Sequence, residues 1–231
     1  MKLGLFADPH YSSKAVTCGI RYNSQSLRKI REAYDCFEKE KCDLIVCLGD
    51  LIDTEIEENK VKSNLLAIAD VIHSVDVPTV CIMGNHDAFS LGADEFYSVL
   101  GDCRPRDIET HGKRLIFLDA CYYKSGERYA KGDGDWTDTF YPQAPQLRNV
   151  LDNSDGDVYL FIHQNIDPAV DAEHRLHNAD SLFNIINESR VVKIVFQGHF
   201  HAGCRSEYDG VKYITLPAMC QNEGAYYVFE I

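Results

Sequence analysis

The sequence lacks a CxxC cysteine pair, and it has no apolar run long enough to cross a membrane. The first absence argues against a zinc ribbon or a thioredoxin-type redox motif. The opening apolar run, residues 3–7, is too short for a signal peptide and leads directly into Asp8. We therefore expect a cytoplasmic protein without a membrane partner, in which cysteines such as Cys47 remain reduced and pack as small hydrophobic residues.

Positive charge is also scarce. The chain has 23 Lys and Arg against 36 Asp and Glu, which gives a net charge of −13. Proteins that bind nucleic-acid polymers usually present a basic face, so we do not expect such a partner. A small anionic substrate stays compatible with this balance, because bound cations can reverse the sign of the local field.

Hydrophobic periodicity predicts an α/β fold. The 231 residues, 45% of them hydrophobic, suffice for one sizeable core, and we expect residues 1–231 to form a single domain. Apolar runs at 3–7, 44–48 and 78–83 predict buried strands, and residues 25–40 and 60–75 repeat apolar side chains at helical spacing. This alternation favours a parallel sheet with both faces covered.

The second half has a different pattern. Strands are predicted at 114–119, 158–162 and 191–197, a short helix at 180–190, and an antiparallel pair at 211–216 and 225–231. Residues 122–146 show no period and predict a functional or mobile loop. Aromatic residues in this loop, Trp136 among them, could stack on a base or simply form a small core of their own.

Five short polar motifs follow apolar runs along the chain. Ligands of open α/β sheets bind beyond the carboxyl ends of the strands, so we expect the motifs to converge there. In two motifs the ligands are two residues apart, which puts both side chains on one side of a strand, where they can address one ion. The motifs are Asp8-Pro9-His10, Gly49-Asp50-Leu51-Ile52-Asp53, Gly84-Asn85-His86-Asp87, His163 and Gly198-His199-Phe200-His201.

The chemistry of these side chains indicates two divalent metal ions beside a general acid. A mixed shell of oxygen and imidazole ligands suits Mn, Fe or Zn better than Ca. Two such ions, about 3.5–4 Å apart, can clamp an attacking hydroxide and a phosphoryl oxygen. Each motif alone has an ordinary explanation as a turn or a hydrogen-bonded histidine. Five such coincidences at five strand ends are a poor account of the whole set.

The motifs resemble those of the calcineurin-like metallophosphoesterases, and the resemblance extends over nearly the whole chain. It implies a sandwich of two mixed β-sheets flanked by helices. It also implies that one Asp bridges the two ions, and that His86, oriented by Asp53, protonates the leaving group or stabilises the transition state. In the mechanism that we expect, Asn85 also stabilises the charge that builds on the phosphoryl oxygens. The implied ligands are Asp8, His10 and His201 for one ion, Asn85, His163 and His199 for the other, and Asp50 as the bridge.

The leading hypothesis is a hydrolase that cleaves a small phosphodiester or pyrophosphate by attack of a metal-bound hydroxide. A phosphomonoesterase is the main alternative, and a non-catalytic interaction scaffold or a DNA-repair nuclease is less favoured. Asp53 is followed by Thr54-Glu55, whereas the protein Ser/Thr phosphatase branch has Arg-Gly, which argues against a phosphoprotein substrate.

A finer similarity covers only the first quarter of the chain. Arg21-Tyr22 and the segment 48–53 resemble the manganese-dependent ADP-ribose/CDP-alcohol diphosphatase branch, which cleaves small nucleotide diphosphates. The candidate substrate contacts are Arg21 and Tyr22 from this segment and Trp136 from the aromatic loop, with Arg128 as a further candidate for contact with phosphate.

Overall fold

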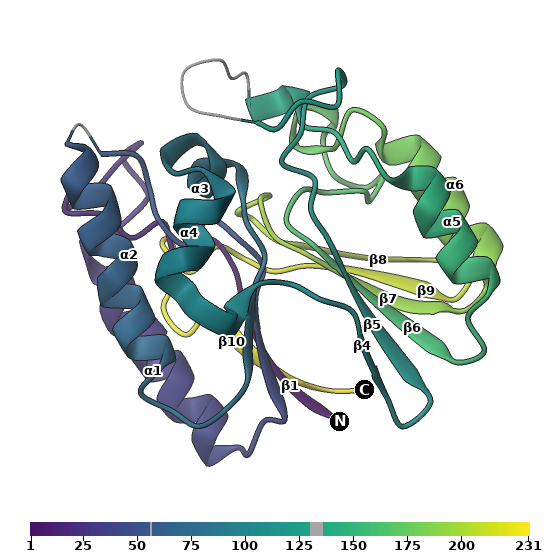
Figure 1. The fold of residues 1–231 in the computed structure, drawn as a ribbon, viewed down its shortest axis with the longest axis horizontal. Helices are drawn as coiled ribbons and strands as arrows, with labels where there is room; N and C mark the ends of the chain where they lie inside the picture. Colours follow the sequence, from purple (N-terminus) through teal and green to yellow (C-terminus); the bar gives the residue numbers. More distant parts are fainter. Residues whose placement is uncertain (56, 130–135) are drawn as a thin grey trace.

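Two β-sheets pack face to face, with helices on both outer sides (Figure 1). The computed structural model describes residues 1–55, 57–129 and 136–231. The strands are β1 Lys2–Phe6, β2 Leu44–Cys47, β3 Thr79–Cys81, β4 Ile108–Thr110, β5 Lys113–Leu118, β6 Asp157–Ile162, β7 Val192–Gln197, β8 Cys204–Tyr208, β9 Val211–Thr215 and β10 Tyr226–Glu230. The α-helices are α1 Ser26–Lys39, α2 Glu58–Ile72, α3 Asn85–Ser90, α4 Ala93–Leu100, α5 Ala144–Asp152 and α6 Ala179–Ser189.

Both sheets are mixed, which confirms the predicted sandwich. The first has the strand order β10-β1-β2-β3 and the second the order β4-β5-β6-β7-β9-β8. Strands β1, β2 and β3 run parallel, as the alternation of strands and helices predicts. Strands β5, β6, β7 and β9 are also mutually parallel, while β10, β4 and β8 are antiparallel to their neighbours.

Side-chain alternation along the strands divides the apolar residues into three layers. In β1, Leu3 and Leu5 face the second sheet and pack in the same cluster as Phe161 and Phe196. Phe6 points the other way, into the cluster formed with α1 and α2. A third cluster fills the space between the second sheet and helices α5 and α6. The two sheets are thus buried on both faces, as parallel sheets require.

One predicted strand pairing is wrong. Strands β9 and β10 belong to different sheets, so the segments 211–216 and 225–231 do not pair with each other. Strand β9 instead forms a hairpin with β8 through Asp209-Gly210, both of which have positive φ angles, 50° and 85°. Such two-residue turns match the twist of paired strands, and this signal was present in the sequence. Strand β10 completes the edge of the first sheet beside β1.

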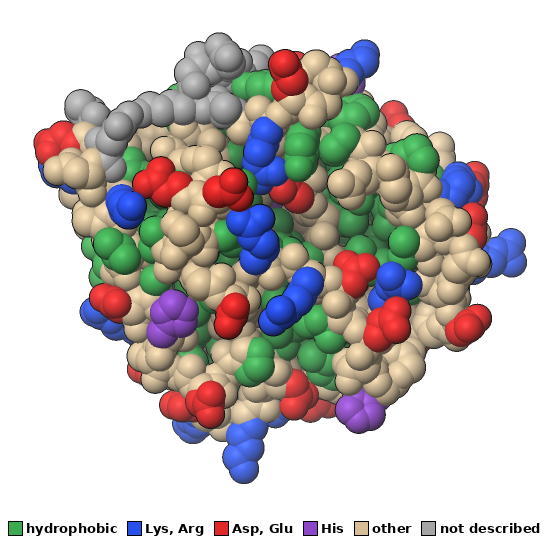
Figure 2. Space-filling model, in the orientation of Figure 1, with side chains coloured by type: hydrophobic (Ala, Val, Ile, Leu, Met, Phe, Trp, Pro, Cys, Tyr) green, Lys and Arg blue, Asp and Glu red, His purple; other side chains and the backbone are tan. Residues whose placement is uncertain are grey.

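The segment 122–146, predicted as a loop, contains more structure than its composition suggested. A 3-10 helix spans Trp136–Asp138 and α5 begins at Ala144, while residues 130–135 lie outside the described residues. Among the residues that the structure describes, no helix has the length and apolarity needed to span a bilayer. On the face shown in Figure 2, Lys and Arg side chains are interspersed with Asp and Glu, and no large basic patch is visible among the described residues there.

Candidate functional site

The polar motifs converge at the carboxyl-terminal edge of both sheets. Their side chains line a cleft of about 390 Å³ that includes Asp50, Asn85, His86, His199 and His201. The turns that carry them continue the pairing of the strands, since the backbone N–H of Asp8 donates to the Gly49 carbonyl at 3.1 Å and that of His10 to the Asp50 carbonyl at 2.9 Å. Strand pairing therefore fixes the positions of these turns.

The same turns carry four of the nine non-glycine residues with positive φ angles in the described part of the chain. Asp8, His10, Asp50 and His199 have φ angles of 54°, 46°, 54° and 67°, in the left-handed region. Residues other than glycine rarely adopt this conformation, which costs on the order of 1–3 kcal/mol each and is found most often at functional sites. The unusual backbone turns these four side chains toward one another.

Two glycines allow the close approach of the turns. A side chain at Gly49 would place its Cβ 2.5 Å from Nδ1 of His163, and Gly49 also has a φ of 101°. A Cβ at Gly84 would collide with the carboxylate and backbone of Asp50. The glycine that precedes Asp50 is therefore required by packing and by its backbone conformation, and the one that precedes Asn85 is required by packing.

Three side chains, Asp8, His10 and His201, form what we call the first group. Nε2 of His10 lies 3.1 Å from Nε2 of His201. Oδ1 of Asp8 is 3.8 Å from the former and 3.7 Å from the latter. The amide of Gln221 contacts Nδ1 of His201 at 2.7 Å and so orients the ring. Burial raises the pKa of Asp8 to about 7, because a fully buried carboxylate is poorly solvated.

The second group consists of Asn85, His163 and His199. Nδ1 of His163 is 2.7 Å from the Leu48 carbonyl, which fixes the proton on that nitrogen. Nε2 of His163 then faces Oδ1 of Asn85 at 3.1 Å and Oδ2 of Asp50 at 3.2 Å. Burial lowers the pKa of His163, but the carboxylate of Asp50 outweighs it and raises this pKa to about 9, so a positive charge is favoured where the three groups meet. A divalent metal ion that replaced the proton on Nε2 would be bound by the same donor atoms, so the donor set fits such an ion.

Asp50 lies between the two groups. Its Oδ1 accepts a hydrogen bond of 2.8 Å from the backbone N–H of His86. Its Oδ2 lies 3.5 Å from Nε2 of His10 and 3.2 Å from Nε2 of His163, so one oxygen reaches both groups. Burial alone would raise the pKa of Asp50, but the neighbouring imidazoles hold this pKa well below its usual range. The side chain is therefore a carboxylate.

His86 and Asp53 form a hydrogen-bonded pair at the edge of the cleft. Nδ1 of His86 is 2.9 Å from Oδ1 of Asp53, and Oδ2 of Asp53 accepts from Nδ2 of Asn23 at 2.9 Å. Burial lowers the pKa of His86, but the carboxylates of Asp50 and Asp53 outweigh it and raise this pKa. Nε2 of His86 faces the Arg21 guanidinium at 3.4 Å. The ring is therefore anchored on one side and presents its other nitrogen to the cleft.

An aromatic wall borders the cleft that Arg21 also lines. The ring centroid of Trp136 lies 5.3 Å from that of His174 and 5.5 Å from that of His199. His174 also lines the cleft, although no motif in the sequence singles it out. It ends a short 3-10 helix, Ala172–His174, which is too short to show a hydrophobic period.

Two of the candidate substrate contacts lie elsewhere. Tyr22 is 42% exposed and does not line the cleft, although Arg21 beside it does. The Arg128 guanidinium donates to Asp119 and to the Tyr122 hydroxyl, both at 2.9 Å, and lines a different pocket. Arg21 and Trp136 are thus the two candidates that the fold brings to the proposed centre.

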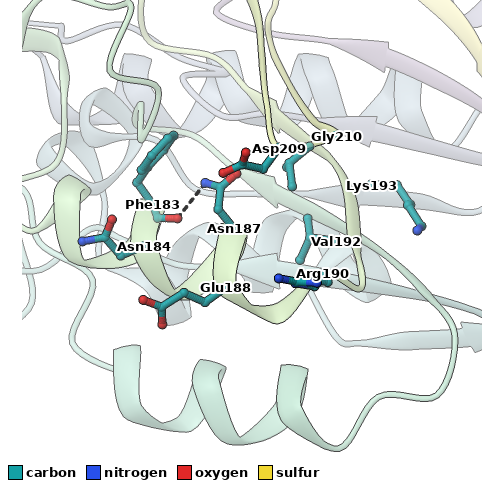
Figure 3. A pocket seen from close by; sticks show the side chains of 10 residues that line it. Phe183, Asn184, Asn187, Glu188, Arg190, Val192, Lys193, Asp209 and Gly210 are labelled. Atoms are coloured by element: carbon teal, nitrogen blue, oxygen red, sulfur yellow. Dashed lines mark hydrogen bonds between the residues drawn. The ribbon is translucent and has the colours of Figure 1, made fainter.

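A larger cavity of about 730 Å³ lies at the opposite end of β7 (Figure 3). Its lining includes Asn187 and Arg190 near the end of α6, Lys193 at the start of β7, and Asp209 in the β8–β9 turn. Nδ2 of Asn187 is already bonded to the Phe183 carbonyl and the Tyr213 hydroxyl. Size alone therefore does not mark the functional site, whereas convergent titratable groups do.

Comparisons with known proteins agree with this geometry. The family model of the calcineurin-like phosphoesterases matches residues 1–203. The chain belongs to this family. It is therefore a metal-dependent phosphoesterase, a hydrolase, as its motifs predict.

Individual relatives of this phosphoesterase have low sequence identity with it. It is 26% identical to a "Probable cyclic nucleotide phosphodiesterase" of Psychrobacter arcticus, over 93% of this chain and 74% of the relative. It is 23% identical to a 3',5'-cyclic adenosine monophosphate phosphodiesterase of Haemophilus influenzae, over 95% of this chain and 77% of the relative. Its fold matches a dimetal phosphatase from Danio rerio with a TM-score of 0.82 at 19% identity, over 96% and 88% of the two chains.

Proposed function

We propose that this protein is a dinuclear-metal phosphodiesterase that acts on a small nucleotide. The observation that carries the proposal is the composition of one cleft. It combines metal-type ligands, the Arg21–His86 pair and the Trp136–His174 wall around a volume of about 390 Å³. That volume suits a small ligand rather than a polymer.

The proposed centre holds two divalent ions, with Mn, Fe or Zn as the candidates for this oxygen and imidazole shell. The first group binds one ion and the second group binds the other. Asp50 bridges them, which the position of its Oδ2 between His10 and His163 supports. When bound, such ions lower the pKa of water and neutralise charge on phosphoryl oxygens.

The remaining residues have roles that follow from their positions. His86 donates a proton from Nε2 to the departing oxygen, because Asp53 anchors Nδ1 and stabilises the protonated ring. Arg21 contacts the phosphate on the same side of the cleft. The Asn85 amide, as a ligand and a neighbour of the reacting centre, contributes to stabilisation of the charge that develops on phosphorus-bound oxygens.

Two findings support a nucleotide diester as substrate. The curated relatives are named as cyclic nucleotide phosphodiesterases. In this chain the ring of Trp136, 38% exposed, borders the cleft beside His174 and offers a face on which a base can stack. A cyclic nucleotide carries a base and a phosphate, and the cleft offers an aromatic face for the first and metal-type ligands for the second.

The test compares three substrates with protein loaded with Mn²⁺: 3',5'-cyclic AMP, ADP-ribose and p-nitrophenyl phosphate. We expect the highest kcat/KM for the cyclic diester. Faster cleavage of ADP-ribose would mean that the substrate is a pyrophosphate and not a diester, in line with the diphosphatase resemblance. Faster cleavage of the monoester would contradict the proposal, and no turnover of any substrate by loaded protein would favour an interaction scaffold.

A further inference from the structure

Cys220 stands apart from the other buried cysteines. Cys42, Cys47, Cys81, Cys103 and Cys121 all pack in the hydrophobic cluster beneath α1 and α2, as thiols that serve as small apolar residues do. Cys220 is also fully buried, but it belongs to none of the three hydrophobic clusters of the described residues. Its surroundings are polar, and they include His10 and His201 of the first group.

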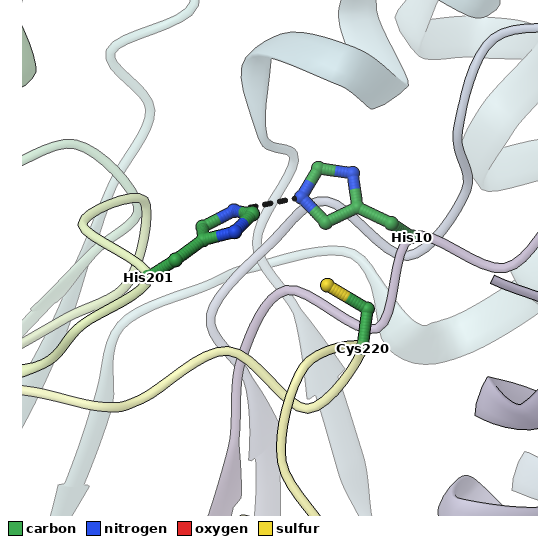
Figure 4. Close-up of side chains that lie close together, drawn as sticks. All are labelled: His10, His201 and Cys220. Atoms are coloured by element: carbon green, nitrogen blue, oxygen red, sulfur yellow. Dashed lines mark hydrogen bonds between the residues drawn. The ribbon is translucent and has the colours of Figure 1, made fainter. Parts of the chain in front are cut away.

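The sulfur lies beside two members of the first group, His10 and His201. Sγ of Cys220, a ring nitrogen of His10 and a ring nitrogen of His201 all lie within 4.8 Å of one another. Figure 4 shows the sulfur pointing at the gap between the two imidazole rings. With zinc-to-sulfur and zinc-to-nitrogen distances of about 2.3 and 2.1 Å, ligands of one ion are separated by at most about 4.4 Å. Only a small closure around an ion is needed.

The backbone holds Cys220 firmly in this position. Its N–H donates to the Asp8 carbonyl at 3.1 Å, so the cysteine is tied directly to a residue of the first group. Its carbonyl accepts a hydrogen bond of 3.0 Å from the backbone of Tyr22. The buried ammonium of Lys29 donates to the carbonyls of Met219 at 3.0 Å and Asn222 at 3.2 Å. The loop is thus clamped on both sides of the cysteine.

We propose that Cys220 supplies a thiolate ligand to the ion of the first group, and that this sulfur makes the position selective for Zn²⁺ over Mn²⁺. The inference rests on the proposed function, because it requires an ion in the first group. On coordination the sulfur lone pair forms the bond to the metal and the thiol proton is released to water, with no change of oxidation state. Thiolate is a soft ligand and prefers Zn²⁺ to the harder Mn²⁺.

Cobalt substitution tests the sulfur directly, without an activity assay. The metal-free wild-type protein, Cys220→Ser and the control Cys18→Ser are titrated with Co²⁺, because Cys18 also lines the cleft. We expect a near-ultraviolet thiolate-to-cobalt charge-transfer band in the wild type and in Cys18→Ser. Cys220→Ser should keep the visible bands of cobalt bound by nitrogen and oxygen but lose the charge-transfer band.

Competition between metals supplies the second readout. Loss of a ligand should weaken Zn²⁺ binding to Cys220→Ser by ~10-fold or more, with a change of less than about 3-fold for Mn²⁺. Equal weakening of both ions would mean that the cysteine only shapes the loop, and would overturn the proposal. If the serine variant does not fold, the cobalt spectra of Cys220→Ala and of the wild type decide whether the sulfur is a ligand.

The outcomes separate this proposal from the one on which it rests. Visible cobalt bands without charge transfer in the wild type would overturn the sulfur ligand and leave the two-ion centre intact. Failure of the wild type to bind cobalt at all would overturn both.

Discussion

The two groups that flank Asp50 differ in how the chain holds them. In the second group the backbone orients a ligand, because the Leu48 carbonyl fixes the tautomer of His163, a fully buried ring. In the first group a side chain has this role, since the Gln221 amide orients His201, whose ring is 15% exposed. Cys220 lies beside His201. A ligand oriented by the backbone is set by the fold itself, whereas one oriented by side chains can be tuned by substitution.

Asp50→Asn should remove the metal ions from both groups. Its Oδ2 reaches both groups, so the neutral amide removes the charge that holds the two ions together. We expect loss of metal and a fall in kcat/KM on the order of 10³-fold or more. Metal content measured by atomic emission, beside the rate, checks this. A fully loaded and active variant would show that Asp50 is no bridge.

His86→Ala should affect neither group but remove the proton donor. With metal content preserved, kcat should fall by ~10²–10⁴-fold, as expected for loss of a general acid. Replacing the leaving group by p-nitrophenolate, which needs no proton, should shrink the defect. Loss of metal in parallel with the rate would instead assign His86 to the metal centre.

Gln221→Leu should weaken one group alone. It removes the contact to Nδ1 of His201, and such outer partners are typically worth about 10–100-fold in metal affinity. Calorimetric titration should show one of two binding events weakened by about that factor. Uniform weakening of both events would mean that the two groups are not independently positioned.

Trp136→Ala should leave both groups intact and test the wall beside them. Stacking of a base on an aromatic ring is worth about 1–3 kcal/mol, and this ring is partly exposed, so we expect KM to rise by ~10-fold with little change in kcat. Trp136→Phe is the matched control and should recover most of the loss. An unchanged KM for a nucleotide would remove Trp136 from the substrate site.

Strand-end motifs were predictable because their cause is local. Asp8, Asp50 and Asn85 each interrupt an apolar run, and a polar residue there must leave the core at the edge of the sheet. The partners of β9 and β10 were not predictable from alternation alone, since both segments have a half-buried pattern and only the Asp209-Gly210 turn distinguishes them. His174 lies in a segment whose only regular structure is a short 3-10 helix, so periodicity gave no signal.

The sequence by itself determined most strands and helices and the ligand types, because these depend on residue spacing and on the periods of strands and helices. The resemblance of its motifs indicated the family and, through the family, the sandwich of two sheets. Only the tertiary structure decided which side chains share a point in space. Cys220 follows no motif and reaches His10 because residues 217–222 fold back across the end of β1. Contacts between segments about 200 residues apart depend on how sheets pair and pack, and short-range pattern does not encode that.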